Sequence, residues 1–427
     1  MVNRTHAPSN GILNLNHITL PTPEVFHLDA GLPVFCIEGG SQELCKVEFI
    51  VGAGSDKQEK PLVAAYTNHM LKEGTATRSS LQISEELDFY GAFLEHYTTP
   101  DTSVIALYTL NKHLEATLPI FVDLIFHAIF PEKEFETLNR RKEQAYRINE
   151  QKVQYVAGKK FRPLLFGEAH PYGGEIVETS FEEISLSDLR SFYEKYYTPD
   201  NARIIIAGKI DRKLIPLLNK LLERGEKRST TSPPPNFHRE APRPQTLVIP
   251  REQTVQSALR MGSLTLNRDH EDYPGVEFTS IVLGGYFGSR LMRNIREDKG
   301  YTYGIGMRVV PLKHGAYFTI ATEVDTHVTQ ATIDEVRKEM KKLRTEEMEQ
   351  EELALVKSYL RGSLMRNFDG AMALSERFRE MSDAGLDNRF YQRVFATVEQ
   401  ITTQEILRIA GSYFHEENLS MVIAGKR

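Results

Sequence analysis

The side chains of His69, Arg296 and Tyr303 have types and spacings that could support chemistry. His69 directly follows Asn68 in the stretch AAYTNHMLKEGT, and Arg296 precedes Tyr303 by seven residues far downstream. An imidazole can bind a metal, but an amide cannot take up a proton near neutral pH. A tyrosine hydroxyl can donate to a developing oxyanion, and an arginine can bind a carboxylate or a carbonyl. The sequence therefore offers groups that bind or stabilise, without a general base beside its histidine.

The segment around His69 resembles the N-terminal signature of a known peptidase family. Residues 47–75 read VEFIVGAGSDKQEKPLVAAYTNHMLKEGT. They resemble the pitrilysin/insulinase-type zinc metallopeptidases, the inverzincins, whose core motif is H-x-x-E-H. The Gly54-Ser55 loop, His69-Met70 and Gly74-Thr75 fit that signature. In the family, two histidines at i and i+4 of a helix hold zinc from one face, and the glutamate between them is the general base. A downstream glutamate is the third ligand, which leaves one position open for water.

The zinc motif is mostly missing from this chain. The resemblance puts the first histidine of the motif at Ala65 and the base at Asn68, so only the second histidine, His69, is retained. One imidazole cannot supply the ~10–16 kcal/mol of a complete zinc site. We therefore expect no zinc and no other cofactor in this chain. We interpret His69 as a hydrogen-bonded structural residue, and the same applies to three histidines whose spacings match no ligand pattern, His96, His113 and His127.

The third ligand of the family is also absent. Asn139-Arg140 is the best match to the family's Glu-Arg pair, and this register puts Tyr146 at the ligand position. Glu143 lies nearby and is the alternative if the register shifts. Even with Glu143, the site would have two ligands and no base.

A second signature is retained in the other half of the chain. Residues 284–306, GGYFGSRLMRNIREDKGYTYGIG, resemble the family's C-terminal signature, which contains S-R-L and then L-R-E-x-K-G-x-x-Y. Arg296 and Tyr303 match its arginine and its tyrosine. In the family these residues come from the half without zinc and reach across a cleft, so the resemblance implies substrate and transition-state contacts in trans. Without the resemblance, Arg296 would be interpreted as a solvent-exposed charged residue of a helix and Tyr303 as an aromatic residue of a strand.

Two segments of the chain repeat each other. Residues 184–209 align with residues 401–426 without a gap at an offset of 217, with seven identical positions. Both contain a polar N-cap, an amphipathic helix, a polar turn with asparagine, and an apolar strand that ends at Ala-Gly. Their positions at the ends of two similar halves indicate a duplication.

The halves are separated by a proline-rich stretch. Pro233–Pro235 exclude a helix or a central strand, so we predict an N-terminal domain at 1–224, a linker at 225–245 and a C-terminal domain at 246–427. Strand and helix patterns recur in both halves, with residues 32–40 and 43–55 expected to form a hairpin. The expected fold is α+β, with two homologous α/β-sandwich halves, each a mostly antiparallel sheet with helices on one face.

Composition excludes several classes of protein. The net charge is −6 with both signs interspersed, which argues against a nucleic-acid partner. No apolar run is long enough to span a membrane, and the N-terminal stretch lacks the apolar core of a secretion signal. We expect Cys36 and Cys45 to be reduced strand residues of a cytoplasmic protein.

The leading hypothesis is a chain that is no peptidase on its own. It would be the zinc-less subunit of a heterodimer in the two-half, processing-peptidase-like branch, with a homologous partner that carries an intact H-x-x-E-H and cleaves peptides. The alternatives are a non-enzymatic scaffold or assembly subunit of the same fold, and a peptidase active alone through a displaced metal site.

Overall fold

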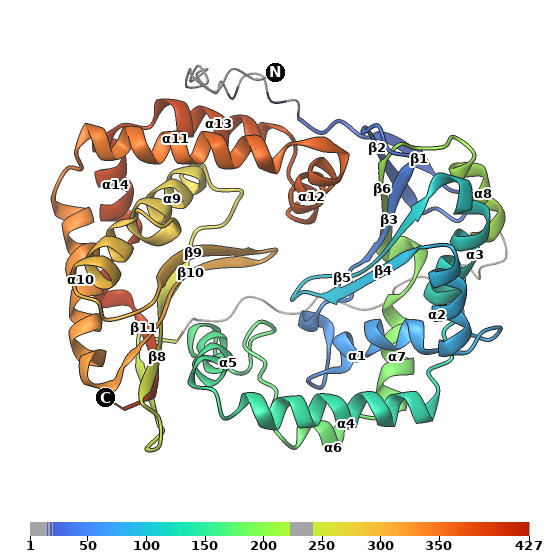
Figure 1. The fold of residues 1–427 in the computed structure, drawn as a ribbon, viewed down its shortest axis with the longest axis horizontal. Coiled ribbons are helices and arrows are strands. Elements are labelled where there is room, and N and C mark those ends of the chain that lie inside the picture. The colour runs from blue at the N-terminus through green and yellow to red at the C-terminus, as the bar shows by residue number, and fades with distance from the viewer. Residues whose placement is uncertain (1–14, 16–17, 19, 223–241, 427) are drawn as a thin grey trace, which may run out of the picture.

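Each half of the chain folds around one sheet in the computed structural model, which describes residues 15, 18, 20–222 and 242–426 (Figure 1). The strand order is β1-β2-β6-β3-β5-β4 in the first sheet and β7-β11-β8-β10-β9 in the second. The pairs β2–β6 and β7–β11 are parallel, and the other pairs are antiparallel. The predicted α+β fold with two mostly antiparallel sheets is confirmed. The strands are β1 (Glu24–His27), β2 (Pro33–Glu38), β3 (Leu44–Val51), β4 (Phe93–Thr98), β5 (Ser103–Leu110), β6 (Ala202–Gly208), β7 (Thr246–Pro250), β8 (Gln256–Thr265), β9 (Ile305–Leu312), β10 (Gly315–Asp325) and β11 (Ser420–Gly425).

Helices cover the sheets in both halves. In the first half they are α1 (Val63–Met70), α2 (Ser80–Phe89), α3 (Leu114–Phe126), α4 (Glu132–Asn149), α5 (Val153–Phe166), α6 (Ser180–Glu183), α7 (Leu186–Tyr196) and α8 (Leu214–Leu222). In the second half they are α9 (Tyr273–Ser280), α10 (Thr329–Thr345), α11 (Gln350–Asn367), α12 (Gly370–Asp383), α13 (Arg389–Gln400) and α14 (Thr403–Tyr413). Most of the predicted linker lies outside the described residues, and the domain limits stay a prediction.

The two repeated segments have the same structure. Helices α7 and α14 begin and end at equivalent positions, and the N-cap side chains of Ser185 and Thr402 each accept a backbone N–H. The glycines that end β6 and β11, Gly208 and Gly425, have φ of +119° and +139°. Residues other than glycine rarely adopt such a positive φ, which explains why both repeats have glycine after alanine at this position.

Replacing Gly208 with alanine is expected to lower the free energy of unfolding by ~1–3 kcal/mol or more, the cost of a strained backbone residue. The new Cβ would also lie 2.3 Å from the Leu44 carbonyl oxygen. Urea unfolding measures the change. Gly174→Ala is the control, because its Cβ would meet no atom within 4 Å. Equal stabilities of the two variants would show that the backbone at position 208 does not require glycine.

The predicted hairpin of residues 32–40 and 43–55 is wrong, because β6 lies between β2 and β3. Val34 of β2 pairs with Ile204, and Val47 of β3 pairs with Ile206. The apolar run of β6 suits a strand that is buried on both faces, and this favours the central position. The cysteines lie on β2 and β3 as free, buried thiols, and burial raises the pKa of each to about 12.

The halves exchange one helix each, which the sequence pattern did not predict. Helix α5 of the first half packs on β8 and β11 of the second sheet, and α12 of the second half packs on β2 and β6 of the first (Figure 1). The Phe378 ring of α12 lies 5.0 Å from that of Phe35. Lys46 of β3 is buried and donates to Glu376 of α12 at 2.5 Å. Each half therefore completes the covering of the other.

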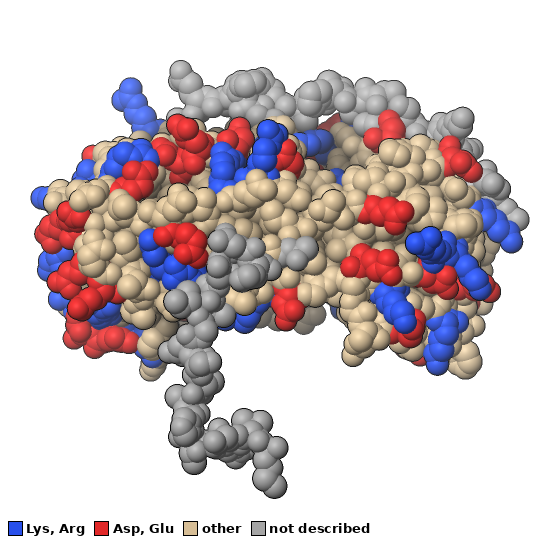
Figure 2. Space-filling view, turned by 90° about the horizontal axis from the view of Figure 1, so that it is seen from above, with Lys and Arg blue, Asp and Glu red and all other residues tan. Residues whose placement is uncertain are grey.

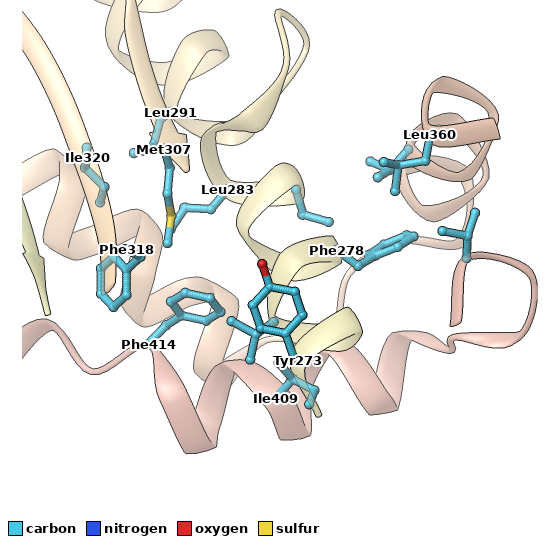
Figure 3. Packing of buried hydrophobic residues seen from close by; sticks show 14 of the residues in the cluster. Tyr273, Phe278, Leu283, Leu291, Met307, Phe318, Ile320, Leu360, Ile409 and Phe414 are labelled. Atoms are coloured by element: carbon cyan, nitrogen blue, oxygen red, sulfur yellow. The ribbon is translucent and has the colours of Figure 1, made fainter. Parts of the chain in front are cut away.

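The core of the second half supports the segment that carries Arg296 and Tyr303. Leu283, Leu291 and Met307 pack together beside Phe318 and Phe414 in Figure 3, and all five are buried. These side chains come from both sides of residues 292–304. The backbone of this segment is thus fixed at both ends by buried apolar contacts.

Figure 2 shows acidic and basic side chains interspersed on the face that it draws, without a large area of one sign. Within the described ranges, no helix has both the length and the apolar character needed to cross a bilayer.

Candidate functional site

Helix α1 is held by a local turn that explains the retained Gly-Thr ending. Gly74 has φ of +152°, and an added Cβ would lie 2.9 Å from Cγ of Pro131. The Thr75 hydroxyl donates to the Asp123 carboxylate at 2.6 Å. The hydroxyl of Thr77 donates to the same carboxylate oxygen at 2.7 Å. The Gly-Thr pair therefore positions the end of the α1 segment and carries no chemistry of its own.

The four positions assigned to the lost zinc site lie together. Ala65, Asn68 and His69 of α1 and Tyr146 of α4 line one pocket of about 410 Å³, with β4 on the other side. Glu143 is not among the lining residues, and it accepts a hydrogen bond from Arg147 at 2.6 Å. The structure thus places Tyr146, rather than Glu143, beside the α1 positions.

His69 is paired with a histidine that the spacing analysis dismissed. Nε2 of His96, on β4, lies 2.9 Å from Nδ1 of His69, and Nε2 of His69 lies 3.5 Å from the Glu73 carboxylate. Burial, with smaller contributions from nearby charges, lowers the pKa of His69 to about 3 and that of His96 to about 4. Both rings are therefore neutral at pH 7. No sequence spacing signals this pair, because packing of β4 on α1 brings it together.

This pair predicts an acid-sensitive stability. In the unfolded chain the imidazoles bind protons below their ordinary pKa of 6.5, whereas in the folded chain they do so only near pH 3–4. Between these limits the unfolded state holds more protons, so the free energy of unfolding falls as the pH falls. The slope is up to ~1.4 kcal/mol per pH unit for each ring, reduced by solvent screening of the partly exposed rings.

Urea unfolding between pH 4 and 7 tests this expectation. A His69→Gln/His96→Gln variant should show a flatter pH dependence than the wild type, while His27→Gln, on exposed β1, should not. If the free energy of unfolding of the double variant depended on pH as steeply as that of the wild type, His69 and His96 would not be the cause of the acid sensitivity.

Asn68 links α1 to the sheet. Its side chain is buried, and Nδ2 donates to the carbonyls of Tyr97 at 2.9 Å and Val104 at 3.0 Å. A carboxylate at this position would place an oxygen, which can only accept, against two carbonyl oxygens that also only accept. An amide can donate to both carbonyls, so it fits these surroundings better than a carboxylate base would. Oδ1 of Asn68 is buried without a hydrogen-bond partner in the described part of the chain.

The residues of this pocket do not fit the family's catalytic zinc. Ala65 offers no donor atom, and the Tyr146 hydroxyl accepts from Lys159 at 3.0 Å. Across the described ranges, no three His, Cys, Asp or Glu side chains are grouped so that they could hold a metal ion. A zinc-bound water and a base to activate it therefore have no support from these side chains.

Arg296 and Tyr303 form a compact pair in the second half. Arg296 Nε donates to the Tyr303 carbonyl at 3.0 Å, and its guanidinium lies over the Phe287 ring, 4.6 Å from the centroid. Tyr303 is 94% exposed, and its hydroxyl has no hydrogen-bond partner among the described residues. Phe287 is also exposed, and the sequence analysis did not single it out. None of the three lines the α1 pocket, so the two candidate sites are separate within one chain.

Packing explains several other parts of the second signature. A Cβ on Gly284 would lie 2.7 Å from that of Met307. Arg290 donates to both oxygens of Glu352 at 3.0 and 2.8 Å. Leu291 is fully buried. Tyr303 differs from these residues because its hydroxyl faces solvent, and the Arg296 side chain beside it is partly exposed.

Comparison with known proteins assigns the family. Residues 34–162 match the family described as Insulinase (Peptidase family M16), and residues 183–360 match Peptidase M16 inactive domain. The chain belongs to peptidase family M16. It is a catalytically incomplete M16 member, and the residues 47–75 that resemble the family signature contain no H-x-x-E-H.

M16 relatives span most of the chain. A Bacillus subtilis protein named Uncharacterized zinc protease YmxG is 24% identical over 77% of this chain and 80% of its own. A Helicobacter pylori protein named Non-peptidase homolog YmxG is 23% identical over 88% of this chain and 87% of its own. The crystal structure of a peptidase M16 inactive domain from Pseudomonas fluorescens has a TM-score of 0.86 at 22% identity, covering 95% of this chain and 98% of that one. A Helicobacter pylori protease structure also gives 0.86, at 17% identity, covering 95% and 100%. At these identities, the likeness to the solved structures is one of fold.

Proposed function

We propose that this chain is the zinc-less subunit of a heterodimeric M16 peptidase and supplies Arg296 and Tyr303 to the active site of a zinc-bearing partner. One observation carries the proposal. The α1 pocket lacks the family's full set of zinc ligands and its carboxylate base, whereas Arg296 and Tyr303 remain adjacent. The Tyr303 hydroxyl is exposed and has no hydrogen-bond partner in the described part of the chain, and Arg296 lies beside it, oriented by the Tyr303 carbonyl, Phe287 and Glu297. The Tyr303 hydroxyl is therefore accessible to a group on another chain.

The two groups can support peptide cleavage without supplying its nucleophile. The Tyr303 hydroxyl can donate to the oxyanion that develops at the scissile carbonyl. The Arg296 guanidinium can bind a substrate carbonyl or carboxylate, and the Phe287 face holds it in place. Attack by water would take place at the partner's H-x-x-E-H site. Peptides and short unfolded segments are the expected substrates, because a chamber closed by two chains excludes folded proteins.

Reconstitution tests this function. The full-length chain is mixed with a homologous M16 chain that carries an intact H-x-x-E-H, and the complex is isolated by gel filtration. We expect zinc to elute with the partner and peptidase activity to appear only in the complex. Full activity of the partner without this chain would refute the proposal.

A scaffold or assembly role is the second candidate. It is favoured by the name of the Helicobacter pylori relative, Non-peptidase homolog YmxG. It predicts a complex in which Arg296 and Tyr303 can both be replaced without loss. A peptidase active alone through a displaced metal would instead show stoichiometric zinc in the purified chain.

A further inference from the structure

The α1 pocket keeps a ligand-sized cavity although, of the family's zinc-binding groups, only His69 is present. Its volume of about 410 Å³ falls in the range of small-molecule sites, ~300–1,000 Å³. Its walls are mostly aromatic and apolar, and include Tyr66, Tyr97, Tyr155, Ile176 and Phe181. The pocket thus offers apolar surface for a group the size of an amino-acid side chain.

The charge of the lining favours an anion. Lys142 of α4 is its one ammonium group, and no carboxylate lines the pocket. In the described part of the chain, no carboxylate lies within ion-pair distance of Lys142. The nearby Lys159 differs, because it is paired with Glu150 at 2.5 Å and Glu175 at 3.3 Å. Lys142 is therefore free to bind an anionic ligand.

A cation is disfavoured by the same surroundings. The two imidazole nitrogens that face each other, on His69 and His96, are already paired at 2.9 Å. Burial, followed by Lys72 and Lys142, lowers the pKa of His96, and the opposite effect of Glu95 is smaller. Burial and the same two lysines contribute to the lowered pKa of His69, whose Nε2 lies 3.5 Å from the Glu73 carboxylate on the side away from His96.

The pocket wall also contains an acceptor without a donor. Both partners of Asn68 Nδ2 are carbonyl oxygens, and this fixes the orientation of the amide. Its Oδ1 is left buried and unpaired, which costs about 1–3 kcal/mol when no donor is present. A ligand N–H group that reached Oδ1 would remove this cost.

We propose that this pocket binds an α-carboxylate together with its neighbouring N–H and an apolar side chain. In this arrangement Lys142 pairs with the carboxylate, Asn68 Oδ1 accepts from the N–H, and the aromatic wall takes the side chain. A peptide's C-terminal residue and a free apolar amino acid share this chemistry. The inference does not rest on the proposed function, because neither Arg296 nor Tyr303 lines the pocket.

Calorimetric titration of the full-length chain tests the proposal. The probes are N-acetyl-phenylalanine, its uncharged amide, free phenylalanine, and a hexapeptide that ends in phenylalanine as either the acid or the amide. We expect the acids to bind and the amides to bind at least about tenfold more weakly, as expected for the loss of one charge-assisted hydrogen bond. Tightest binding by the peptide acid would identify a peptide C-terminus as the source, and tightest binding by free phenylalanine would identify the amino acid.

Two variants locate the binding. Lys142→Met should weaken binding of the acids at least about tenfold, while Lys133→Met, an exposed lysine in the first turn of the same helix, should not. Ala65→Phe should fill the pocket and abolish binding of every probe. Equal binding of acid and amide, no binding at millimolar concentration, or binding that survives both pocket variants would overturn the proposal. None of these outcomes would affect the test of Arg296 and Tyr303.

Discussion

Replacing Tyr303 with phenylalanine is expected to lower kcat/KM of the reconstituted complex about 10²–10³-fold, or ~2.7–4 kcal/mol, the usual effect of removing one oxyanion donor. Tyr303 is 94% exposed, so the loss of its hydroxyl removes no intrachain contact and should leave the fold intact. Because the hydroxyl acts on the transition state, the decrease should fall mainly on kcat.

Matched controls separate catalysis from structure. Tyr301→Phe changes a neighbouring tyrosine that packs against the core, and its complex should keep wild-type activity. Arg296→Ala should also reduce kcat/KM, whereas Arg293→Ala, one helical turn earlier and exposed, should not. If all four variants had the same activity, the proposal that Arg296 and Tyr303 contact the substrate would be wrong, and the scaffold role would be favoured.

Restoring two ligands should restore a zinc site. In an Ala65→His/Tyr146→Glu variant, the new side chains enter the pocket that His69 already lines, and together they recreate the three-ligand set of the family. Complete zinc sites supply ~10–16 kcal/mol, so the variant should bind zinc stoichiometrically after dialysis. The gain is partly offset by breaking the contact of His69 with His96, about 1 kcal/mol.

Zinc content by mass spectrometry and affinity by competition with a chelator measure this result. Ala65→His/Gln144→Glu is the control, because Gln144 is an exposed residue of the same helix that does not line the pocket. A folded Ala65→His/Tyr146→Glu protein without zinc, or equal zinc in the control, would show that the pocket no longer has the geometry of a zinc site.

Local features of the fold could be predicted from the sequence, but long-range pairing could not. The repeat correctly indicated equivalent helices α7 and α14, because a capped helix followed by an apolar strand is a local pattern. The insertion of β6 between β2 and β3 depends on contacts between strands more than 150 residues apart, which alternation along one strand cannot specify. The exchange of α5 and α12 could not be predicted either, because each helix packs on the sheet of the other half and its own sequence does not specify that sheet.

The candidate sites show the same limit. The seven-residue spacing of Arg296 and Tyr303 suggested a unit, and the turn at Gly300, with φ of +65°, brings them into contact. His96 lies 27 residues after His69 and meets it only because β4 packs on α1. Its role therefore could not be found from spacing. The loss of a ligand at Ala65 and of the base at Asn68 follows from the resemblance to the family motif, which supplies the register, and it stays a prediction.

A photo-cross-link at position 303 shows whether Tyr303 reaches the zinc site of a partner chain. The chain carries p-benzoylphenylalanine in place of Tyr303, is assembled with its H-x-x-E-H partner, and is irradiated before the cross-linked peptides are identified by mass spectrometry. We expect cross-links to the partner's zinc-motif helix or to a peptide bound beside it. Cross-links confined to this chain, or to a partner surface away from the zinc motif, would contradict it.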